Sequence, residues 1–248
     1  MQIKETPSPN FGDRKDDGPV DILLLHYTGM PSAEGALAWL CDPRSTVSSH
    51  YFVFEDGRIT RLVDEGRRAH HAGVSNWLGE TDINSRSIGI EIANPGHEFG
   101  YVPFPEAQIA ALTLLCRDIL RRHPIPAERV LAHSDVAPLR KADPGEFFPW
   151  ERLHRDGIGH YVPPVPWSDG PTLSVGALGP AVTELKDRFR KYGYGLVEAA
   201  EFDAGMAGVV AAFQRHFRPE RIDGVADVST RQTLERLIAA LPSAIAAK

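Results

Sequence analysis

The chain has 248 residues, of which 42% are hydrophobic and 24% are charged, a composition typical of a globular protein that excludes a disordered chain. Its 27 lysines and arginines against 33 aspartates and glutamates give a net charge of −6, without the basic excess of proteins that bind phosphate backbones. We therefore expect one large domain or two smaller ones, and no nucleic-acid partner.

The first half of the chain alternates between strand-like and helix-like stretches. Residues 21–25 are a short continuous apolar run, which predicts a central strand covered on both faces. Residues 51–54 and 59–63, joined by an Asp-Gly turn, predict a β-hairpin. Residues 87–92 alternate with a period of two and predict a further strand.

A helix and another strand follow. Pro105 opens a predicted helix with one apolar face, formed by Ile109, Leu112, Cys116, Ile119 and Leu120. Residues 129–132 predict a short strand. The fold class predicted for residues 1–162 is therefore α/β, with a mixed central β-sheet flanked by helices.

Residues 163–172 are rich in proline and predict an extended linker to a second domain at residues 173–248. Beyond the linker the apolar residues recur with a helical period, which predicts a small three-helix domain. The three apolar stripes are Leu178, Val182, Leu185, Phe189 and Tyr192; Met206, Val209, Val210, Phe213 and Phe217; and Leu234, Leu237, Ile238 and Leu241. Ser229 and Gln232 fit a capping box at the start of the last helix.

Three polar residues lie in or directly after predicted strands. His26 follows residues 23–25 and His133 follows residues 130–132, at strand ends where sheets place functional groups. Glu91 lies in a strand and shares its face with Gly89 and Ala93, so that small neighbours leave space around the carboxylate. The alternative is a carboxylate that is merely paired with an arginine.

Residues 133–145 contain an imidazole, two carboxylates, a lysine and two prolines in one loop. Two histidines and one carboxylate can bind zinc and leave a position open for water. The residues alone leave a second interpretation open, in which each histidine is a satisfied core or surface group. We expect this for His97, His123, His154, His160 and His216.

Several segments, taken together and in this order, resemble the zinc-dependent N-acetylmuramoyl-L-alanine amidases of the AmpD and AmiD type. They are Leu25–Thr28, Val47–Tyr51, His71–Ser75, Ile83–Glu91, Ala132–Asp135 and Arg140–Gly145. The second half resembles the three-helix peptidoglycan-binding domain that is often joined to such enzymes. Its matching segments are Gly179–Val182, Tyr192–Tyr194, Ala212–Gln214 and Ile222–Asp227.

The resemblance implies a role for five residues. It implies His26, His133 and Asp143 as ligands of a Zn²⁺ ion, and Glu91 as the acid and base that activates water. Lys141 would stabilise the oxyanion that forms when water attacks the amide carbon. Four further residues are predicted to bind substrate, namely His50, His71, Trp77 and Asn84.

The implied activity is hydrolysis of the amide bond between N-acetylmuramic or 1,6-anhydro-N-acetylmuramic acid and L-alanine. The expected partners are muropeptides or the peptidoglycan sacculus, in cell-wall recycling or turnover. The alternative is a peptidoglycan-binding protein of the same fold without turnover. A pure binder typically lacks a zinc ligand, and all three are present here.

The sequence also favours a location. No apolar run approaches the roughly 18 residues that a membrane span needs. The first ten residues lack the apolar stretch of a signal peptide, which predicts a cytoplasmic protein. The alternative is a periplasmic or outer-membrane-anchored protein whose signal has been removed.

Overall fold

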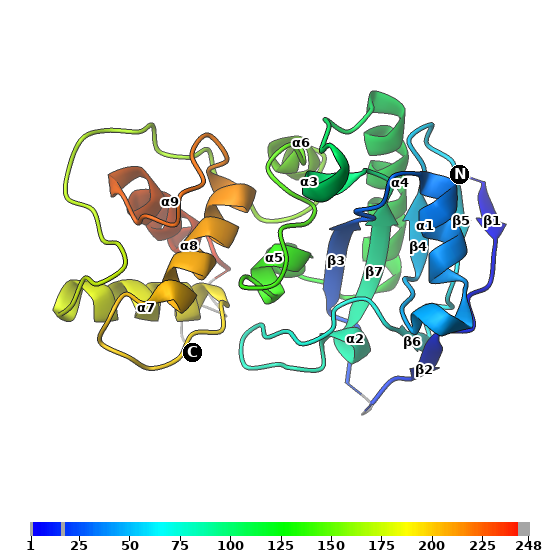
Figure 1. Ribbon diagram of the computed structural model, residues 1–248, viewed down its shortest axis with the longest axis horizontal. Coiled ribbons are helices and arrows are strands. Elements are labelled where there is room, and N and C mark those ends of the chain that lie inside the picture. Colours follow the sequence, from blue (N-terminus) through cyan, green and yellow to red (C-terminus); the bar gives the residue numbers. More distant parts are fainter. Residues whose placement is uncertain (1, 16–17, 243–248) are drawn as a thin grey trace.

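The computed structural model describes residues 2–15 and 18–242 and shows an α/β domain followed by three helices (Figure 1). The strands are β1 (Ile3–Glu5), β2 (Phe11–Asp13), β3 (Ile22–Tyr27), β4 (Tyr51–Val53), β5 (Ile59–Arg61), β6 (Arg67–Ala69), β7 (Ser87–Ile92) and β8 (Val130–Ala132). The helices of the first domain are α1 (Ala33–Leu40), α2 (Ile83–Arg86), α3 (Gly96–Phe99), α4 (Glu106–Arg122), α5 (His133–Val136) and α6 (Trp150–Arg155), with 3-10 turns at Pro43–Ser45 and Ala127–Arg129. No helix within the described ranges is long and apolar enough to cross a membrane.

The central sheet is mixed, as predicted, with the strand order β1-β5-β4-β7-β3-β8. β3 lies between β7 and β8 and runs parallel to both, so its apolar residues Ile22–Leu25 are completely buried. β4 and β5 form the predicted antiparallel hairpin, whose turn contains Gly57 at a φ of 86°. β2 and β6 pair separately as a two-stranded sheet.

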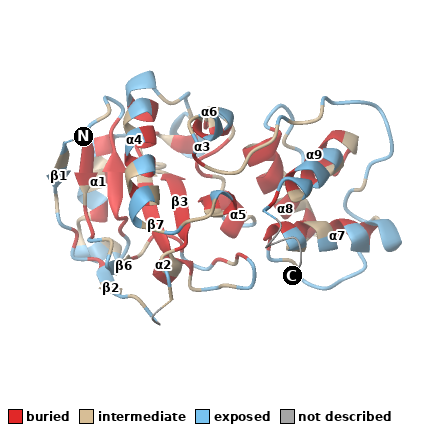
Figure 2. Cartoon of the chain, turned by 180° about the vertical axis from the view of Figure 1, so that it is seen from behind, coloured by how far each residue is buried: buried red, intermediate tan, exposed pale blue. Residues whose placement is uncertain are grey.

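Helices cover both faces of the central sheet. α4 begins directly after Pro105 and packs its apolar stripe against the face that contains Leu23 and Leu25. Figure 2 shows this helix with its buried side toward the strands and its exposed side outward. On the opposite face α1 packs against β4 through Ala36, Leu40 and Phe52. The carboxyl ends of β3 and β8 meet α5 on this second face, and the candidate site lies there.

The second domain consists of α7 (Pro180–Tyr192), α8 (Ala204–Phe217) and α9 (Val228–Ala239), as the three apolar stripes predicted. Leu178 is an exception, because it precedes α7 and 72% of its surface is exposed. The core of this domain continues into the first one. Ile22 and Leu24 of β3 belong to the same buried cluster as Phe213 of α8.

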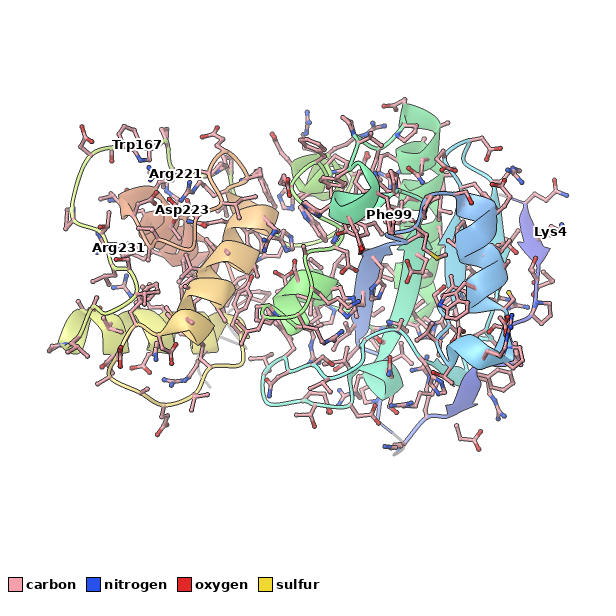
Figure 3. The ribbon with its side chains drawn as sticks, in the orientation of Figure 1. Lys4, Phe99, Trp167, Arg221, Asp223 and Arg231 are labelled. Carbon is pink, nitrogen blue, oxygen red and sulfur yellow. The ribbon has the colours of Figure 1, made fainter. Side chains whose placement is uncertain are left out.

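The proline-rich residues 163–172 form no helix or strand and lie along α9. The Val165 N–H donates to Thr233 Oγ1 at 3.0 Å, and the Ser229 hydroxyl donates to the Val165 carbonyl at 2.5 Å. The capping box predicted from Ser229 is therefore wrong, because Asp227 caps α9 by accepting from the Thr230 N–H at 2.7 Å. Trp167 and Arg231, both labelled in Figure 3, lie on this side of the domain.

Candidate active site

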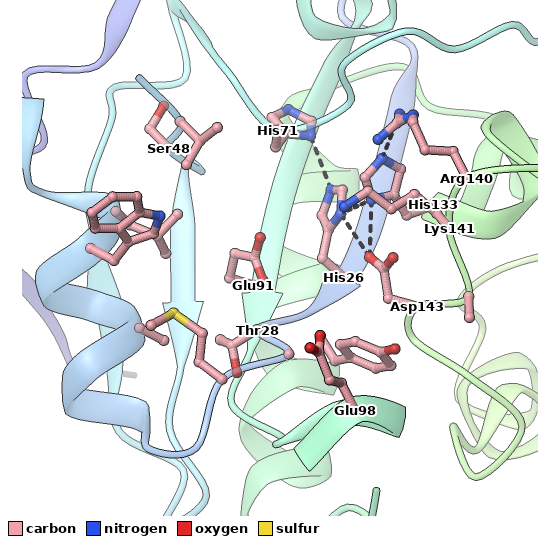
Figure 4. Close-up of a pocket in the computed structure, with 18 of the residues that line it drawn as sticks. His26, Thr28, Ser48, His71, Glu91, Glu98, His133, Arg140, Lys141 and Asp143 are labelled. Carbon is pink, nitrogen blue, oxygen red and sulfur yellow. Dashed lines mark hydrogen bonds and ion pairs between the residues drawn. The ribbon is translucent and has the colours of Figure 1, made fainter. Parts of the chain in front are cut away.

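Three buried side chains converge where β3 and β8 end (Figure 4). His26 lies near the end of β3, His133 is the first residue of α5, and Asp143 comes from the following loop. The two Nδ1 atoms are 2.9 Å apart, and Asp143 Oδ2 lies 3.1 Å from that of His26 and 3.0 Å from that of His133. Three ligand atoms of the kinds predicted from the sequence thus meet at one point.

This group fits a metal ion. Nitrogen and carboxylate ligands lie about 2.0–2.2 Å from zinc, so neighbouring ligand atoms of a tetrahedral site are about 3.3 Å apart. The three observed separations are slightly shorter than this spacing, and the three atoms form one metal-compatible group. They line a pocket of about 510 Å³, which leaves a fourth position open toward a ligand.

Hydrogen bonds to the outer nitrogens fix both imidazoles in the form that a metal requires. His133 Nε2 donates to the Ala72 carbonyl at 2.9 Å, which leaves Nδ1 free of a proton. His26 Nε2 lies 3.0 Å from His71 Nδ1. The direction of this bond follows from Ser87, whose hydroxyl donates to the Ile83 carbonyl at 2.6 Å.

Because the hydroxyl hydrogen of Ser87 already takes part in the bond to Ile83, Ser87 Oγ must accept from His71 Nε2 at 3.3 Å. His71 Nδ1 is then the acceptor for the proton on His26 Nε2, and His26 Nδ1 presents its lone pair to the site. Burial, followed by the nearby His133 imidazole, lowers the pKa of His26 to about 4. The ring is therefore neutral near pH 7, as a metal ligand must be.

Glu91 lies on the neighbouring strand in register with His26, so both side chains project from the same face of the sheet. Glu91 Oε2 is buried and has no hydrogen-bond partner among the described residues. Burial, and next the Asp143 carboxylate, raise the pKa of Glu91 well above its usual range, while Lys141 acts in the opposite direction. A carboxylate with this environment is suited to accept and return a proton.

Gly89 has a role that the sequence suggested only in part. A Cβ at this position would lie 2.5 Å from the His71 ring, so the space beside Glu91 is filled by that imidazole. The lack of a side chain at Gly89 thus allows His71 to reach His26. The face predicted for the Glu91 strand is correct, since Ile88 and Ile90 point into the opposite core.

The four predicted substrate-binding residues have different surroundings in the structure. His71 lines the pocket, and it also contacts a metal-site histidine. The prediction for Trp77 is wrong, because only 1% of its surface is exposed and its ring packs on Tyr192 and Tyr194 of the second domain. Asn84 does not line the pocket, and its substrate contact stays a prediction. Its Oδ1 accepts from the His71 N–H at 3.0 Å and from the neighbouring Ala72 N–H, which holds the backbone of that segment.

His50 is completely buried and does not line the pocket, so its predicted substrate contact is wrong too. Its Nδ1 accepts from the Gly89 N–H at 3.0 Å, and its Nε2 donates to the Arg67 carbonyl at 3.1 Å. This neutral ring ties the strand that carries Glu91 to the segment before β4. His50 therefore helps to hold β7 in position.

His50 gives a prediction about acid stability. Burial, followed by the Arg14 guanidinium, lowers the pKa of His50 from 6.5 to about 3. Between these values the unfolded chain binds one more proton than the folded one at this position. The free energy of unfolding therefore falls by about 1.4 kcal/mol per pH unit as the pH drops below 6.5. We expect His50→Asn to remove this part of the slope.

Urea unfolding of the metal-free protein between about pH 7 and pH 5 measures the slope. Other buried histidines add slopes of their own, so the relevant quantity is the difference between wild type and His50→Asn. His154→Asn changes an exposed histidine and should keep the wild-type slope. Equal slopes for wild type and His50→Asn would contradict the assignment.

The sequence analysis missed several residues around the site. His97, expected on the surface or in the core, lines the pocket and stacks on Tyr101 with ring centroids 4.4 Å apart. Tyr101 stacks in turn on Phe147 at 4.8 Å. Phe147 and Phe148 directly follow the loop of residues 133–145, but no local motif marks His97 or Tyr101. Arg140 also lines the pocket and donates to the Ala72 carbonyl at 2.6 Å.

Fold and site together are those of a class of hydrolase, with three side chains that could hold a metal ion and an adjacent carboxylate on a mixed sheet. Residues 16–146 match the family described as N-acetylmuramoyl-L-alanine amidase. Residues 179–234 match the family described as a peptidoglycan binding domain. The chain therefore belongs to the N-acetylmuramoyl-L-alanine amidase family, as the spaced motifs indicated.

Particular relatives match the chain over different lengths. The chain is 38% identical over 237 residues to the N-acetylmuramoyl-L-alanine amidase AmiD of Escherichia coli K12, covering 88% of this chain and 82% of AmiD. It is 32% identical over 167 residues to the 1,6-anhydro-N-acetylmuramyl-L-alanine amidase AmpD of Haemophilus influenzae, covering 60% of this chain and 89% of AmpD.

Two solved structures resemble the whole chain. One is E. coli AmiD in complex with anhydro-N-acetylmuramic acid-L-Ala-D-γ-Glu-L-Lys, with a TM-score of 0.77, 34% identity, and coverage of 93% of this chain and 97% of that one. The other is AmpDh3 of Pseudomonas aeruginosa in complex with anhydromuramic pentapeptide. It has a TM-score of 0.75, 32% identity, and coverage of 96% of this chain and 99% of that one.

Proposed function

We propose that this chain is a zinc hydrolase that cuts the amide bond between N-acetylmuramic or 1,6-anhydro-N-acetylmuramic acid and L-alanine. The observation that carries the proposal is the convergence of His26, His133 and Asp143 at about 3 Å from one another, beside Glu91, whose Oε2 has no hydrogen-bond partner in the described part of the chain. Family membership and the named relatives support the same bond as the target.

The chain's own residues have separate tasks in this reaction. His26, His133 and Asp143 would hold the zinc ion, which when bound polarises the amide carbonyl and lowers the pKa of water. Glu91 takes the proton of the attacking water and returns it to the leaving nitrogen of L-alanine. Lys141, which lines the same pocket, places a positive charge near the oxygen that becomes negative.

The pocket fits a muropeptide in its chemistry. Its lining combines polar groups with the rings of Tyr27, Trp39 and His97, which suits the faces of a sugar and the polar groups of a peptide. The AmiD and AmpDh3 structures contain anhydromuramic peptides, which supports the same class of substrate here. The second domain matches a peptidoglycan-binding family, which supports peptidoglycan fragments or the sacculus as partners.

Mass spectrometry of the products tests this function. Purified anhydro-muropeptide and intact sacculi are incubated with the zinc-loaded protein, with and without a chelator. We expect release of free stem peptide that begins at L-alanine, and its loss when the chelator removes zinc. Products that result from cleavage within the stem peptide would instead indicate a peptidase.

The alternative function is peptidoglycan binding without turnover. The test distinguishes it, because a binder would retain muropeptide on the zinc-loaded protein and yield no cleaved product. The complete triad, together with Glu91 and Lys141 in the same pocket, favours the enzyme. The cytoplasmic location and the domain boundaries at residues 163–172 stay predictions, which cell fractionation and limited proteolysis of the full chain can test.

A further inference from the structure

The second domain packs against α5, the helix that carries His133, on the side away from the sheet. α5 lies between the sheet and the three helices of that domain (Figure 1). Its Asp135 is completely buried, and both carboxylate oxygens face partners. Oδ1 accepts from the Tyr194 hydroxyl at 2.7 Å, and Oδ2 accepts from His216 Nδ1 at 2.7 Å. Oδ2 also accepts from the Ala132 N–H at 2.8 Å, beside the start of α5.

The two donors from the second domain are themselves fixed. The His216 ring stacks on Trp150 of α6, with ring centroids 3.7 Å apart and an interplanar angle of 24°. The Tyr194 ring packs against Phe189 and Trp77, and only 2% of its surface is exposed. Neither donor can turn toward water, so both hydrogen bonds restrain Asp135 in one position.

The second domain also holds the segment that orients His133 from the other side. The Leu78 N–H donates to the Gly193 carbonyl at 2.8 Å, and a Cβ at Gly193 would lie 2.4 Å from the Trp77 ring. This segment starts at Ala72, whose carbonyl accepts the Nε2 proton of His133. The ligand and the group that fixes its tautomer are therefore both supported by residues beyond the linker.

We propose that the second domain is a structural part of the metal site, with Tyr194 and His216 acting as positioning residues for His133 through Asp135. A buried carboxylate that loses its donors shifts toward water or other partners, and α5 has only four residues with which to resist this movement. The Nδ1 atom of His133 would then leave the position that it shares with His26 and Asp143. The affinity for metal thus depends on contacts made by the second domain.

This inference rests on the metal site of the proposed function, but it does not depend on which bond the enzyme cuts. It is tested in the full chain with the double variant Tyr194→Phe/His216→Leu, which removes both donors and keeps two apolar side chains in place. The matched control is Tyr192→Phe. It removes the hydroxyl that lies 2.9 Å from His160 Nδ1, which is another contact between the two halves of the chain but not a hydrogen bond to Asp135.

Competition with a chromophoric chelator measures the dissociation constant for Zn²⁺. We expect the double variant to bind zinc about tenfold more weakly than wild type, in the range seen when outer partners of metal ligands are removed. Its activity should fall at limiting zinc and recover in excess zinc, with KM unchanged. Tyr192→Phe should lower the melting temperature and keep the wild-type affinity for zinc.

His216→Asn provides a rescue, since the asparagine amide can donate from nearly the position of Nδ1. Its zinc affinity should stay near that of wild type. If the double variant does not fold, Tyr194→Phe alone tests the proposal, because it keeps the ring and removes only the donor. Equal zinc affinities in wild type, Tyr192→Phe and the donor-lacking variant would overturn the inference. Wild-type protein that binds no zinc would instead overturn the proposed function.

Discussion

Replacing Glu91 by glutamine is expected to lower kcat about a thousandfold while zinc stays bound and KM changes little. Glutamine has nearly the size of glutamate but cannot accept the proton of the attacking water, and proton transfer of this kind contributes about 10²–10⁴-fold to a rate. The Glu91 carboxylate is not one of the three metal-compatible ligands, so its loss should leave them in place. Steady-state kinetics with anhydro-muropeptide, together with the zinc content of the purified variant, measures both effects.

The control for this experiment is Glu98→Gln. Glu98 lines the same pocket from α3 but is exposed, so its replacement should leave kcat within a few fold of wild type. A Glu91→Gln enzyme that keeps more than about a tenth of the wild-type kcat would show that another group moves the proton. Loss of zinc from this variant would place Glu91 among the ligands.

Replacing His133 by alanine is expected to remove zinc and activity together. A site with only His26 and Asp143 lacks the third ligand of an open catalytic centre. A bound metal would supply several kcal/mol of transition-state stabilisation, so its loss is expected to lower kcat by about four orders of magnitude. Metal analysis of the dialysed protein and product release from anhydro-muropeptide check the two parts of this result.

Asp143→Asn serves as a second variant, because it keeps the shape of the side chain and removes its charge. It should also lose zinc, whereas His154→Ala, at an exposed histidine outside the site, should retain both zinc and turnover. Circular dichroism of each variant shows whether the fold is kept. A folded His133→Ala protein that binds one zinc ion and cuts substrate at the wild-type rate contradicts the ligand assignment.

The positions of His26 and His133 could be predicted because the sheet itself places them. His26 and His133 follow short apolar runs that predict buried strands, and β3 and β8 are parallel neighbours whose carboxyl ends meet. Asp143 required the resemblance to the amidases, since it lies in a loop whose path no periodicity describes. The face of Glu91 followed from simple alternation along β7.

Two of the substrate-binding predictions failed for a different reason. His50 and Trp77 lie near the motifs, but their partners lie on segments far along the chain. Trp77 is the clearest case, because its neighbours belong to the second domain. The apolar stripe of a helix does not predict which residue of another domain packs against it. The predicted capping of α9 was wrong for a local reason. Asp227 and Ser229 both have side chains that can cap a helix. The Ser229 hydroxyl instead donates to the Val165 carbonyl of the linker, and Asp227 caps α9.

The register between β3 and β7 has a consequence for how this scaffold tolerates change. His26 and Glu91 are direct partners on two parallel strands, so backbone hydrogen bonds set the distance between these strands at about 4.8 Å. The long stretch from Tyr27 to Ile83 can therefore gain or lose residues at its exposed turns without altering that spacing. Such insertions or deletions would change the rim of the pocket, while His26 and Glu91 keep their separation. Selectivity is therefore expected to change with that rim as long as His71 and Ala72 keep their contacts with His26 and His133.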